Sequence, residues 1–173
     1  MSLPPLLVKL SGADRRSIGR SEAVVADVLA QPELFDVAFE GMLHPNPVIR
    51  MRAADAVEKI TAQRPDLLRP YKKKLITQIA KVDQPEVRWH AAQMFSRLSL
   101  TRKERRTVVG ILNTYLNDPS RIVRTFAMQA LADIAEQDSE LRPAIVKQIE
   151  TLAHTGSPAM QSRGRKLLTK LKR

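Results

Sequence analysis

Hydrophobic residues recur along this chain at the three- and four-residue spacing that places side chains on one face of a helix. Apolar residues follow Arg50 at six, seven and ten positions, and the same offsets hold after Arg88 and Arg124. The residues at these offsets are Ala56, Val57 and Ile60, then Met94, Phe95 and Leu98, then Ala130, Leu131 and Ile134. The pattern predicts three equivalent amphipathic helices.

The three helices form an internal repeat, because their arginines are 38 and 36 residues apart. A weaker fourth copy has Gln161 in place of the arginine, 37 residues after Arg124. Apolar stripes predict partner helices over residues 34–43, 67–79, 108–116 and 141–152, and an earlier helix over residues 21–30. One helix pair cannot bury its stripe alone, so the pairs are expected to stack side by side.

Capping signals mark where several of these helices begin. Thr101 and Glu104 have the spacing of a capping box, in which each side chain satisfies the other residue's backbone N–H. Asp118-Pro119 and Ser157-Pro158 each fit a cap residue followed by proline at the first helical position. We therefore expect helices to start after Thr101, Asp118 and Ser157.

A similar sequence segment precedes the second helix of each repeat, and together these segments resemble those of the HEAT-repeat family. They are His44-Pro-Asn-Pro-Val-Ile-Arg50, Asp83-Gln-Pro-Glu-Val-Arg88 and Asp118-Pro-Ser-Arg-Ile-Val-Arg124. The resemblance implies an all-α fold: a right-handed α-solenoid of about four to five stacked antiparallel helix pairs. It implies one domain over residues 1–173, with a weak first repeat near 14–43, clear repeats over 44–154 and a capping helix over 157–173.

The resemblance also suggests a structural role for the residues that recur at the joints. In HEAT proteins the turn aspartate and the following arginine form a hydrogen-bonded ladder between neighbouring repeats. The residues placed in this ladder are Arg50, Asp83, Arg88, Asp118 and Arg124. A row of phosphate contacts is the alternative role for the three arginines, and the fixed register of the repeat favours the ladder.

Composition narrows the classes of function. The 173 residues contain no cysteine, which excludes disulfides and thiolate metal sites, and no run of apolar residues is long enough to span a membrane. No cofactor or metal motif is present, the N-terminus is a poor signal peptide, and a cytoplasmic monomer is expected. The formal net charge of +11 favours a polyanionic partner, although a generally basic protein without an anion site is the alternative.

The second helices of HEAT pairs line the concave face, which makes that face the first candidate binding surface. Exposed positions are expected two, five and nine residues after each arginine. The binding residues predicted on and beside this ridge are Arg52, Trp89, His90, Arg97, Arg163 and Lys166. For Trp89 two roles stay open, packing against a neighbouring helix and stacking on a ligand.

Two further basic clusters lie outside the ridge. One consists of Lys72, Lys73 and Lys74, and the other of Arg102, Lys103, Arg105 and Arg106. Consecutive charges cannot share one helical face, so part of each cluster is expected simply to face water. The segment from Ala159 to Arg173 is also rich in cations and has no acid, which suits an anion-binding arm or a charged helix end.

No catalytic motif is recognisable, so the sequence predicts a non-enzymatic scaffold that binds a protein or an anionic partner. Sequence-independent nucleic-acid binding through phosphate neutralisation is the alternative. A more distant alternative is a DNA glycosylase, because some bacterial alkylpurine glycosylases are HEAT-like and use an aromatic residue with a carboxylate. Trp89 and Asp55 are the residues that would imitate that pair.

Overall fold

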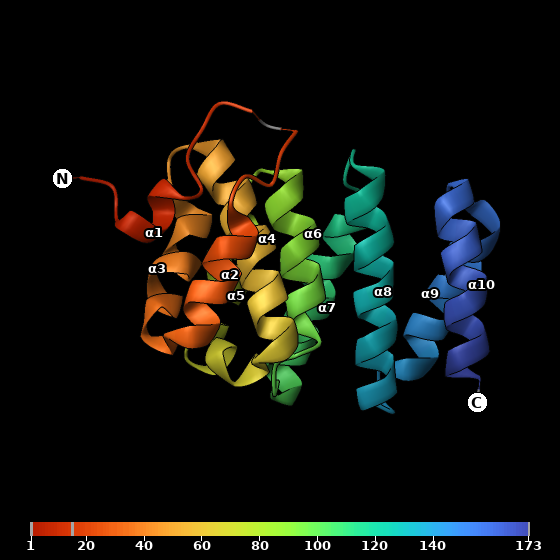
Figure 1. Ribbon diagram of the computed structural model, residues 1–173. Coiled ribbons are helices and arrows are strands. Elements are labelled where there is room, and N and C mark those ends of the chain that lie inside the picture. The colour runs from red at the N-terminus through yellow and green to blue at the C-terminus, as the bar shows by residue number, and fades with distance from the viewer. Residues whose placement is uncertain (1, 15, 173) are drawn as a thin grey trace. The chain divides into compact units, whose positions relative to one another are not determined.

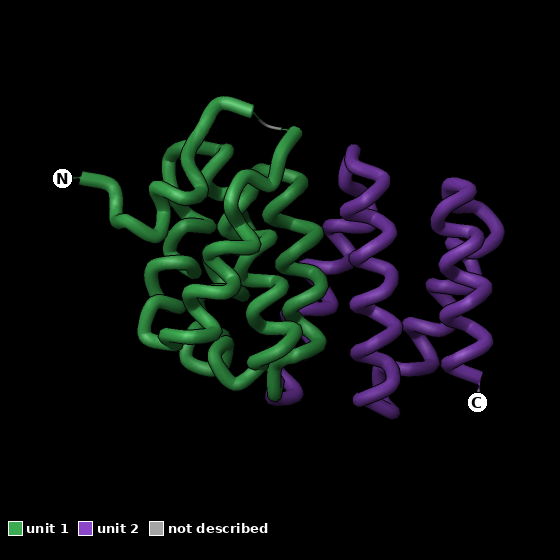
Figure 2. The backbone as a smooth tube through the Cα atoms, viewed as in Figure 1, with its two compact units in different colours: residues 1–99 green, residues 100–173 purple. Residues whose placement is uncertain are grey.

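A computed structural model of the chain describes residues 2–14 and 16–172. These residues form helices and connecting turns, with no β-strand among them (Figure 1). The chain divides into two compact units, residues 1–99 (unit 1) and 100–173 (unit 2), which are coloured separately in Figure 2. The single domain expected from the sequence stays a prediction. No helix of the described chain is long and apolar enough to cross a membrane.

Unit 1 contains six α-helices and four 3-10 turns in its described part. The α-helices are α1 (Pro5–Val8), α2 (Ser21–Ala30), α3 (Phe35–Glu40), α4 (Pro47–Gln63), α5 (Lys72–Thr77) and α6 (Pro85–Phe95). The 3-10 turns are η1 (Pro32–Leu34), η2 (Gly41–Leu43), η3 (Pro65–Tyr71) and η4 (Ile79–Lys81). The helix predicted over residues 21–30 is confirmed as α2.

The predicted partner helices over residues 34–43 and 67–79 are wrong as continuous helices. Each is a short α-helix flanked by 3-10 turns. In the second, Pro70 lies inside η3, where it supplies no backbone N–H for an α-helical hydrogen bond. The apolar stripe is nevertheless buried, since Leu68, Leu75 and Ile79 are fully enclosed.

Helices α2, α4 and α6 lie in a row, with α4 in contact with both neighbours (Figure 1). Ala53, Ala54 and Ala56 of α4 and Ala91 and Ala92 of α6 have no exposed surface. Alanine lets two helices approach closely and gives the row a thin, well-filled interface. Larger side chains such as Phe39, Phe95 and Met94 are also fully buried in this unit.

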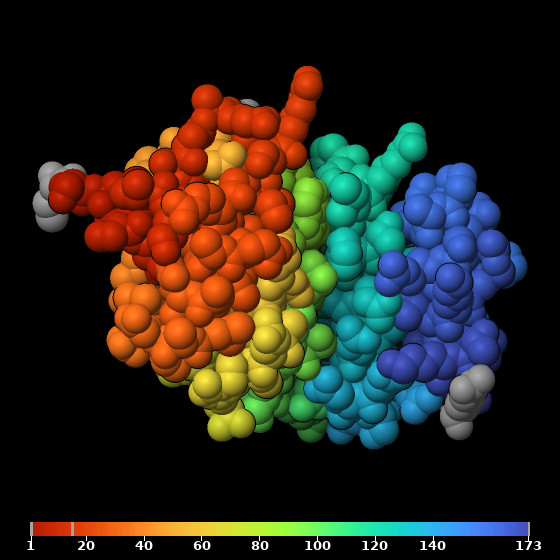
Figure 3. All heavy atoms as spheres, viewed as in Figure 1, coloured from red at the N-terminus to blue at the C-terminus, as the bar shows by residue number. Residues whose placement is uncertain are grey.

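The N-terminal segment packs onto unit 1 rather than extending from it. Leu6, Leu7 and Leu10 are buried, and Leu7 lies so close to Gly41 that a Cβ added there would be 3.0 Å from its Cδ2 atom. In the space-filling view the segment lies directly against the surface of α2 and α3 (Figure 3). It therefore contributes to the core of unit 1.

Unit 2 consists of α7 (Arg102–Tyr115), α8 (Arg121–Gln137), α9 (Arg142–Thr155) and α10 (Pro158–Leu171) in the part described. Helix α8 packs against α7, α9 and α10, and α10 also packs against α9. The capping box at Thr101 and Glu104 is confirmed, as is the Ser157 cap, whose hydroxyl accepts from the Met160 N–H at 3.4 Å. The predicted Asp118 cap is wrong: α8 begins at Arg121 and is capped by Ser120.

Polar links join equivalent helices of successive sequence copies within each unit. In unit 1 the Ser21 hydroxyl donates to Asp55 at 2.7 Å and the Tyr71 hydroxyl donates to Asp36 at 3.1 Å. In unit 2 the Gln148 amide donates to Asn113 at 3.0 Å. These partners are 34 or 35 residues apart, which is close to the spacing of the sequence repeat.

A close helix contact in unit 2 involves Gly164 of α10. A Cβ at this position would lie 2.8 Å from the Cβ of Ala153 and 3.2 Å from its Cα. Gly110 of α7, in contrast, has open space around it, because an added Cβ would meet no atom within 4 Å. We expect Gly164→Ala to destabilise the protein by about 1–3 kcal/mol through overpacking.

Gly110→Ala is the matched control and should stabilise the protein by about 1 kcal/mol, since alanine has the higher helix propensity. Denaturant unfolding followed by circular dichroism measures both changes. Equal effects of the two substitutions would contradict the close approach of α9 and α10.

Candidate functional site

Arg52, predicted as an exposed binding residue, is only 3% exposed and is part of the folded interior. Its guanidinium donates to four backbone carbonyls, those of Leu10, Ser11, Asp14 and Ser17, at up to 3.0 Å. These contacts fold the N-terminal segment around the α4 arginine. The expected exposure of Arg52 is therefore wrong, because the side chain is buried and four of its five N–H donors bind carbonyls of the same unit.

Gly19 shows how tightly this segment fits against the guanidinium. Its φ of +59° lies in the left-handed region, and an added Cβ would be 2.8 Å from the Cζ of Arg52. No sequence signal distinguishes Arg52 from the other ridge arginines, since its acceptors are main-chain carbonyls 35 to 42 residues away.

Arg97 is also held inside unit 1. Its guanidinium donates to the carbonyl of Glu58 at 2.7 Å and to the hydroxyl of Thr61 at 2.9 Å, and it forms an ion pair with the Glu58 carboxylate. Both charged side chains are at least four-fifths buried. Arg97 thus ties the turn after α6 to α4, and its charge is already neutralised.

His90 belongs to α6, and its side chain is near Arg97 and the charged groups of α4. Burial lowers its pKa below the ordinary value of 6.5, with Lys59 and Arg97 acting in the same direction and Asp55 and Glu58 opposing them. Its ring is 5.6 Å from that of Trp89, and both side chains are partly exposed. The two roles of Trp89, packing and stacking, therefore both stay open.

The predicted ridge residues of unit 2 differ from one another in their contacts. Arg163 donates to the Gln129 side chain of α8 at 2.8 Å, whereas Lys166 is exposed without a partner among the described residues. The neighbouring Asp133 is partly buried, which raises its pKa. Lys166, and to a smaller extent Arg163, can therefore reach a ligand.

The lysine cluster on α5 separates into three different environments. Lys72 donates to the Ser99 carbonyl at 3.2 Å, Lys74 forms an ion pair with Glu40, and Lys73 is exposed. Successive helical positions differ by about 100°, so neighbouring lysines point in different directions. The cluster does not present three charges together.

The arginine cluster on α7 separates in the same way, into two pairs. Arg102 and Arg105 bind the acids of the α8–α9 turn, with distances of 2.6 Å to Glu140 and 2.6 Å to Asp138. The hydrogen bond from Arg105 lowers the pKa of Asp138. Lys103 and Arg106 are exposed and have no carboxylate partner in the described chain, so only this pair offers its charge to a ligand.

The residues expected in a ladder mostly close their own turns. Arg50 donates to the carbonyls of His44 and Pro45 at 2.8 and 2.9 Å, and to Gln84 of the next copy at 2.8 Å. Asp83 instead accepts from Arg88 of its own copy at 2.8 Å. The link from Arg50 to the next copy therefore uses the Gln84 amide and not the Asp83 carboxylate.

Two of the residues expected in the ladder, Asp118 and Arg124, belong to unit 2. Asp118 is buried and accepts from the Ser120 N–H at 2.8 Å, which orders the turn before α8. The Nε of Arg124 is buried without a hydrogen-bond partner in the described chain. Gln161 replaces the arginine in the fourth copy and donates to the Gly156 carbonyl at 3.0 Å, so it closes a turn as Arg50 does.

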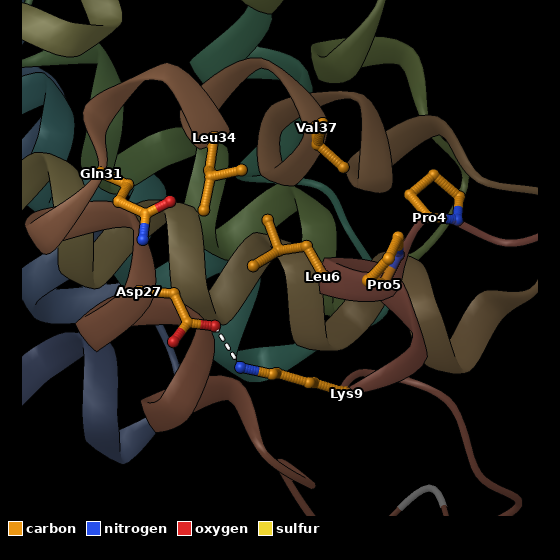
Figure 4. A pocket seen from close by; sticks show the side chains of 8 residues that line it. All are labelled: Pro4, Pro5, Leu6, Lys9, Asp27, Gln31, Leu34 and Val37. Atoms are coloured by element: carbon orange, nitrogen blue, oxygen red, sulfur yellow. Dashed lines mark hydrogen bonds and ion pairs between the residues drawn. The ribbon is translucent and has the colours of Figure 1, made fainter.

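A shallow groove of about 350 Å³ lies between the N-terminal segment, α2 and α3 (Figure 4). Its walls are mainly apolar, with an ion pair between Lys9 and Asp27 along one edge. The lining residues are Pro4, Pro5, Leu6, Lys9, Asp27, Gln31, Leu34 and Val37. Among the described residues no group of three histidines or acids is placed to hold a metal ion.

The sequence did not indicate which cations of unit 2 are paired with acids and which are not. The described part of the unit has thirteen Lys and Arg residues and seven acids. Every acid there is engaged: Glu136, Glu140, Asp138 and Glu150 by cations, and Glu104, Asp118 and Asp133 by N–H groups. The cations left without a carboxylate partner include Arg121, Lys147 and Arg165 as well as the predicted Lys103, Arg106 and Lys166.

Comparison of the chain with models of protein families found no match, and comparison with curated protein sequences found none either.

We expect Arg52→Met to destabilise the protein by about 3–5 kcal/mol, because it removes a buried charge and leaves several carbonyls unsatisfied. Arg69→Met, at an exposed position on the same unit, should change stability by less than about 0.5 kcal/mol. Urea unfolding measures both values. A small loss for Arg52→Met would contradict its role in holding the N-terminal segment.

The pKa of His90 predicts a pH dependence of stability. Because this pKa is lowered in the folded state, the unfolded state binds more protons below about pH 6.5. The contribution of His90 to the free energy of unfolding is therefore fully present above that pH and falls as the pH is lowered. The difference in unfolding free energy between wild type and His90→Gln should shrink from pH 7.5 to pH 5. A difference that grows on acidification would oppose the assigned burial.

Proposed function

We propose that this protein is a non-enzymatic helical-repeat binding module whose unit 2 binds an anionic partner. The observation that carries the proposal concerns residues 100–172. Every acidic side chain there is engaged within the unit, while at least six exposed cations have no carboxylate partner among the described residues. An excess of accessible positive charge attracts polyanions and raises their rate of association.

The exposed residues of unit 2 strengthen the proposal. Nine of the exposed residues described there are Lys or Arg, and two are acidic, Glu136 and Glu140. Both acids are already in ion pairs, with Lys170 at 2.7 Å and with Arg102 at 2.6 Å. A ligand approaching the described part of this unit therefore meets uncompensated positive charge and no unpaired acidic side chain.

The repeat pattern supports a HEAT-like right-handed solenoid of about four to five helix pairs as the architecture of this module. Three kinds of observation favour it: the spacing of the sequence copies, the turn-closing residues at equivalent positions, and polar links between helices 34 or 35 residues apart. Scaffolds of this kind present broad surfaces rather than enclosed active sites. A cytoplasmic monomer is part of the same proposal.

An enzymatic function has less support. In the glycosylase alternative Asp55 would be the reactive carboxylate, yet its Oδ2 atom accepts from Ser21 at 2.7 Å and lies 3.0 Å from Lys59. Asp55 thus belongs to the polar contacts that connect α2 with α4. Base release from alkylated DNA that disappears in Asp55→Asn is the result that would restore this alternative.

The proposal is tested with fluorescently labelled duplex DNA and with labelled polyglutamate, titrated with the full chain at about 50 and 200 mM salt. Binding at the lower salt should weaken at least about tenfold at the higher salt, as expected when several charges are neutralised. Replacing Lys103, Arg106, Lys147, Arg165 and Lys166 by glutamine should abolish it.

The matched control removes the same charge from unit 1, by replacing the exposed cations Arg16, Arg20, Arg69, Lys73 and Lys81 with glutamine. This variant should keep most of the affinity. Equal losses in the two variants would reject unit 2 as the binding unit. Absence of binding to both polyanions at the lower salt concentration would reject the proposed function.

A further inference from the structure

The acid-free face of α7 and α9 points to a specific partner for unit 2. We infer that this face, called here the α7–α9 face, binds the phosphate backbone of duplex nucleic acid without reading its sequence. The inference rests on the proposed function and names the surface and the class of ligand. The face is defined by the exposed residues Lys103, Arg106, Thr107, Gly110, Asn113, Thr114, Lys147 and Thr151.

The two helices lie beside each other. Both pack against α8, and the side chain of Gln148 donates to the Oδ1 of Asn113 at 3.0 Å. This bond joins the middle of α9 to the end of α7. Lys147 is an exposed residue of α9 within one turn of Gln148, so it lies near the exposed residues at the end of α7.

Three cations on the face are available to a ligand. Lys103 and Arg106 are three residues apart on α7, about 4.5 Å along the helix axis, and point in similar directions. Lys147 is contributed by α9. All three are exposed and have no acidic partner in the described chain, whereas Arg102 and Arg105 are turned toward the α8–α9 turn and neutralised there.

No carboxylate on the face opposes an anion. The two acids in these helices are both engaged. Glu104 accepts from the Thr101 N–H at 2.8 Å, and Glu150, whose side chain is 43% exposed, lies 2.9 Å from Lys172. The positive charge of the face is therefore not cancelled locally.

The centre of the face admits a backbone closely. Gly110 is exposed, and a side chain added there would meet no atom within 4 Å. Around it are short neutral side chains, including Thr107 and Thr114, whose hydroxyls donate to carbonyls of their own helix at 3.1 and 3.2 Å. Phosphate groups can thus reach Arg106 without displacing bulky side chains.

The chemistry of the face favours a duplex over other polyanions. The face has no exposed large apolar side chain, because the one such residue described in unit 2 is Ile122 of α8. Protein interfaces usually depend on apolar or aromatic anchors, so the face is poorly suited to a protein partner. It also has no exposed Phe, Tyr or Trp ring on which unpaired bases could stack. Duplex nucleic acid offers the highest density of phosphate charge, about one per 1.7 Å of its axis.

The test measures binding of a labelled duplex of about 20 base pairs and arbitrary sequence to the full chain over a range of salt concentrations. Replacing Lys103, Arg106 and Lys147 by glutamine should lower the slope of log affinity against log salt by about 2.7, the value for three lost phosphate contacts. The control, Arg69, Lys73 and Lys81 to glutamine, removes equal charge from unit 1 and should leave the slope nearly unchanged.

A second pair of variants probes the centre of the face without removing a cation. Gly110→Glu should weaken duplex binding at least about tenfold more than Gly110→Gln, because the two side chains have similar size and differ in charge. Urea unfolding of all variants establishes that they are folded. This comparison separates repulsion of an anion from simple obstruction of the face.

Several outcomes would overturn the inference. If duplex binding survives the face variant but is lost when Arg165 and Lys166 are replaced, the ligand binds α10 and only the proposed function stands. If single strands or polyglutamate compete as well as the duplex at equal charge concentration, the ligand class is wrong. Binding to none of these polyanions would remove the proposed function together with the inference.

Discussion

Close packing of alanine- and glycine-bearing helices is the constraint on which each unit depends. In unit 1 the buried alanines of α4 and α6 let the helices approach with little intervening volume, and in unit 2 Gly164 lies against Ala153. At such distances the polar side chains at the edges of the interfaces can reach one another. The links from Ser21 to Asp55 and from Arg97 to Glu58 follow from this approach.

This packing also decides which charges remain available. In the described part of unit 2, Glu136, Asp138, Glu140 and Glu150 pair with cations of another element that packing brings within reach. The other three acids accept N–H groups of their own helix or turn. The cations exceed the acids, so the surplus stays on the exposed sides of the helices. The net charge gives the number of surplus cations, while the ion pairs and hydrogen bonds show which cations remain unpaired.

The two units use buried or neutralised charge differently. In unit 1 Arg52 holds the N-terminal segment and Arg97 binds Glu58, which makes the face of α2, α4 and α6 a set of internal connections. In unit 2 the corresponding helices contribute Lys166, which is exposed. A ligand surface is accordingly better supported on unit 2, where α7 and α9 present exposed cations and their two acids are already engaged.

The sequence by itself determined the positions of the long helices, the apolar stripe and the helix starts at Thr101 and Ser157, because these depend on residues within one or two turns of each other. It also determined that consecutive charges on α5 and α7 must separate. The tertiary structure decided the role of Arg52, whose acceptors are main-chain carbonyls of a distant segment and leave no side-chain pattern. It likewise decided which cations are neutralised, since their partners lie about one repeat away along the chain and are selected by helix packing rather than by local sequence.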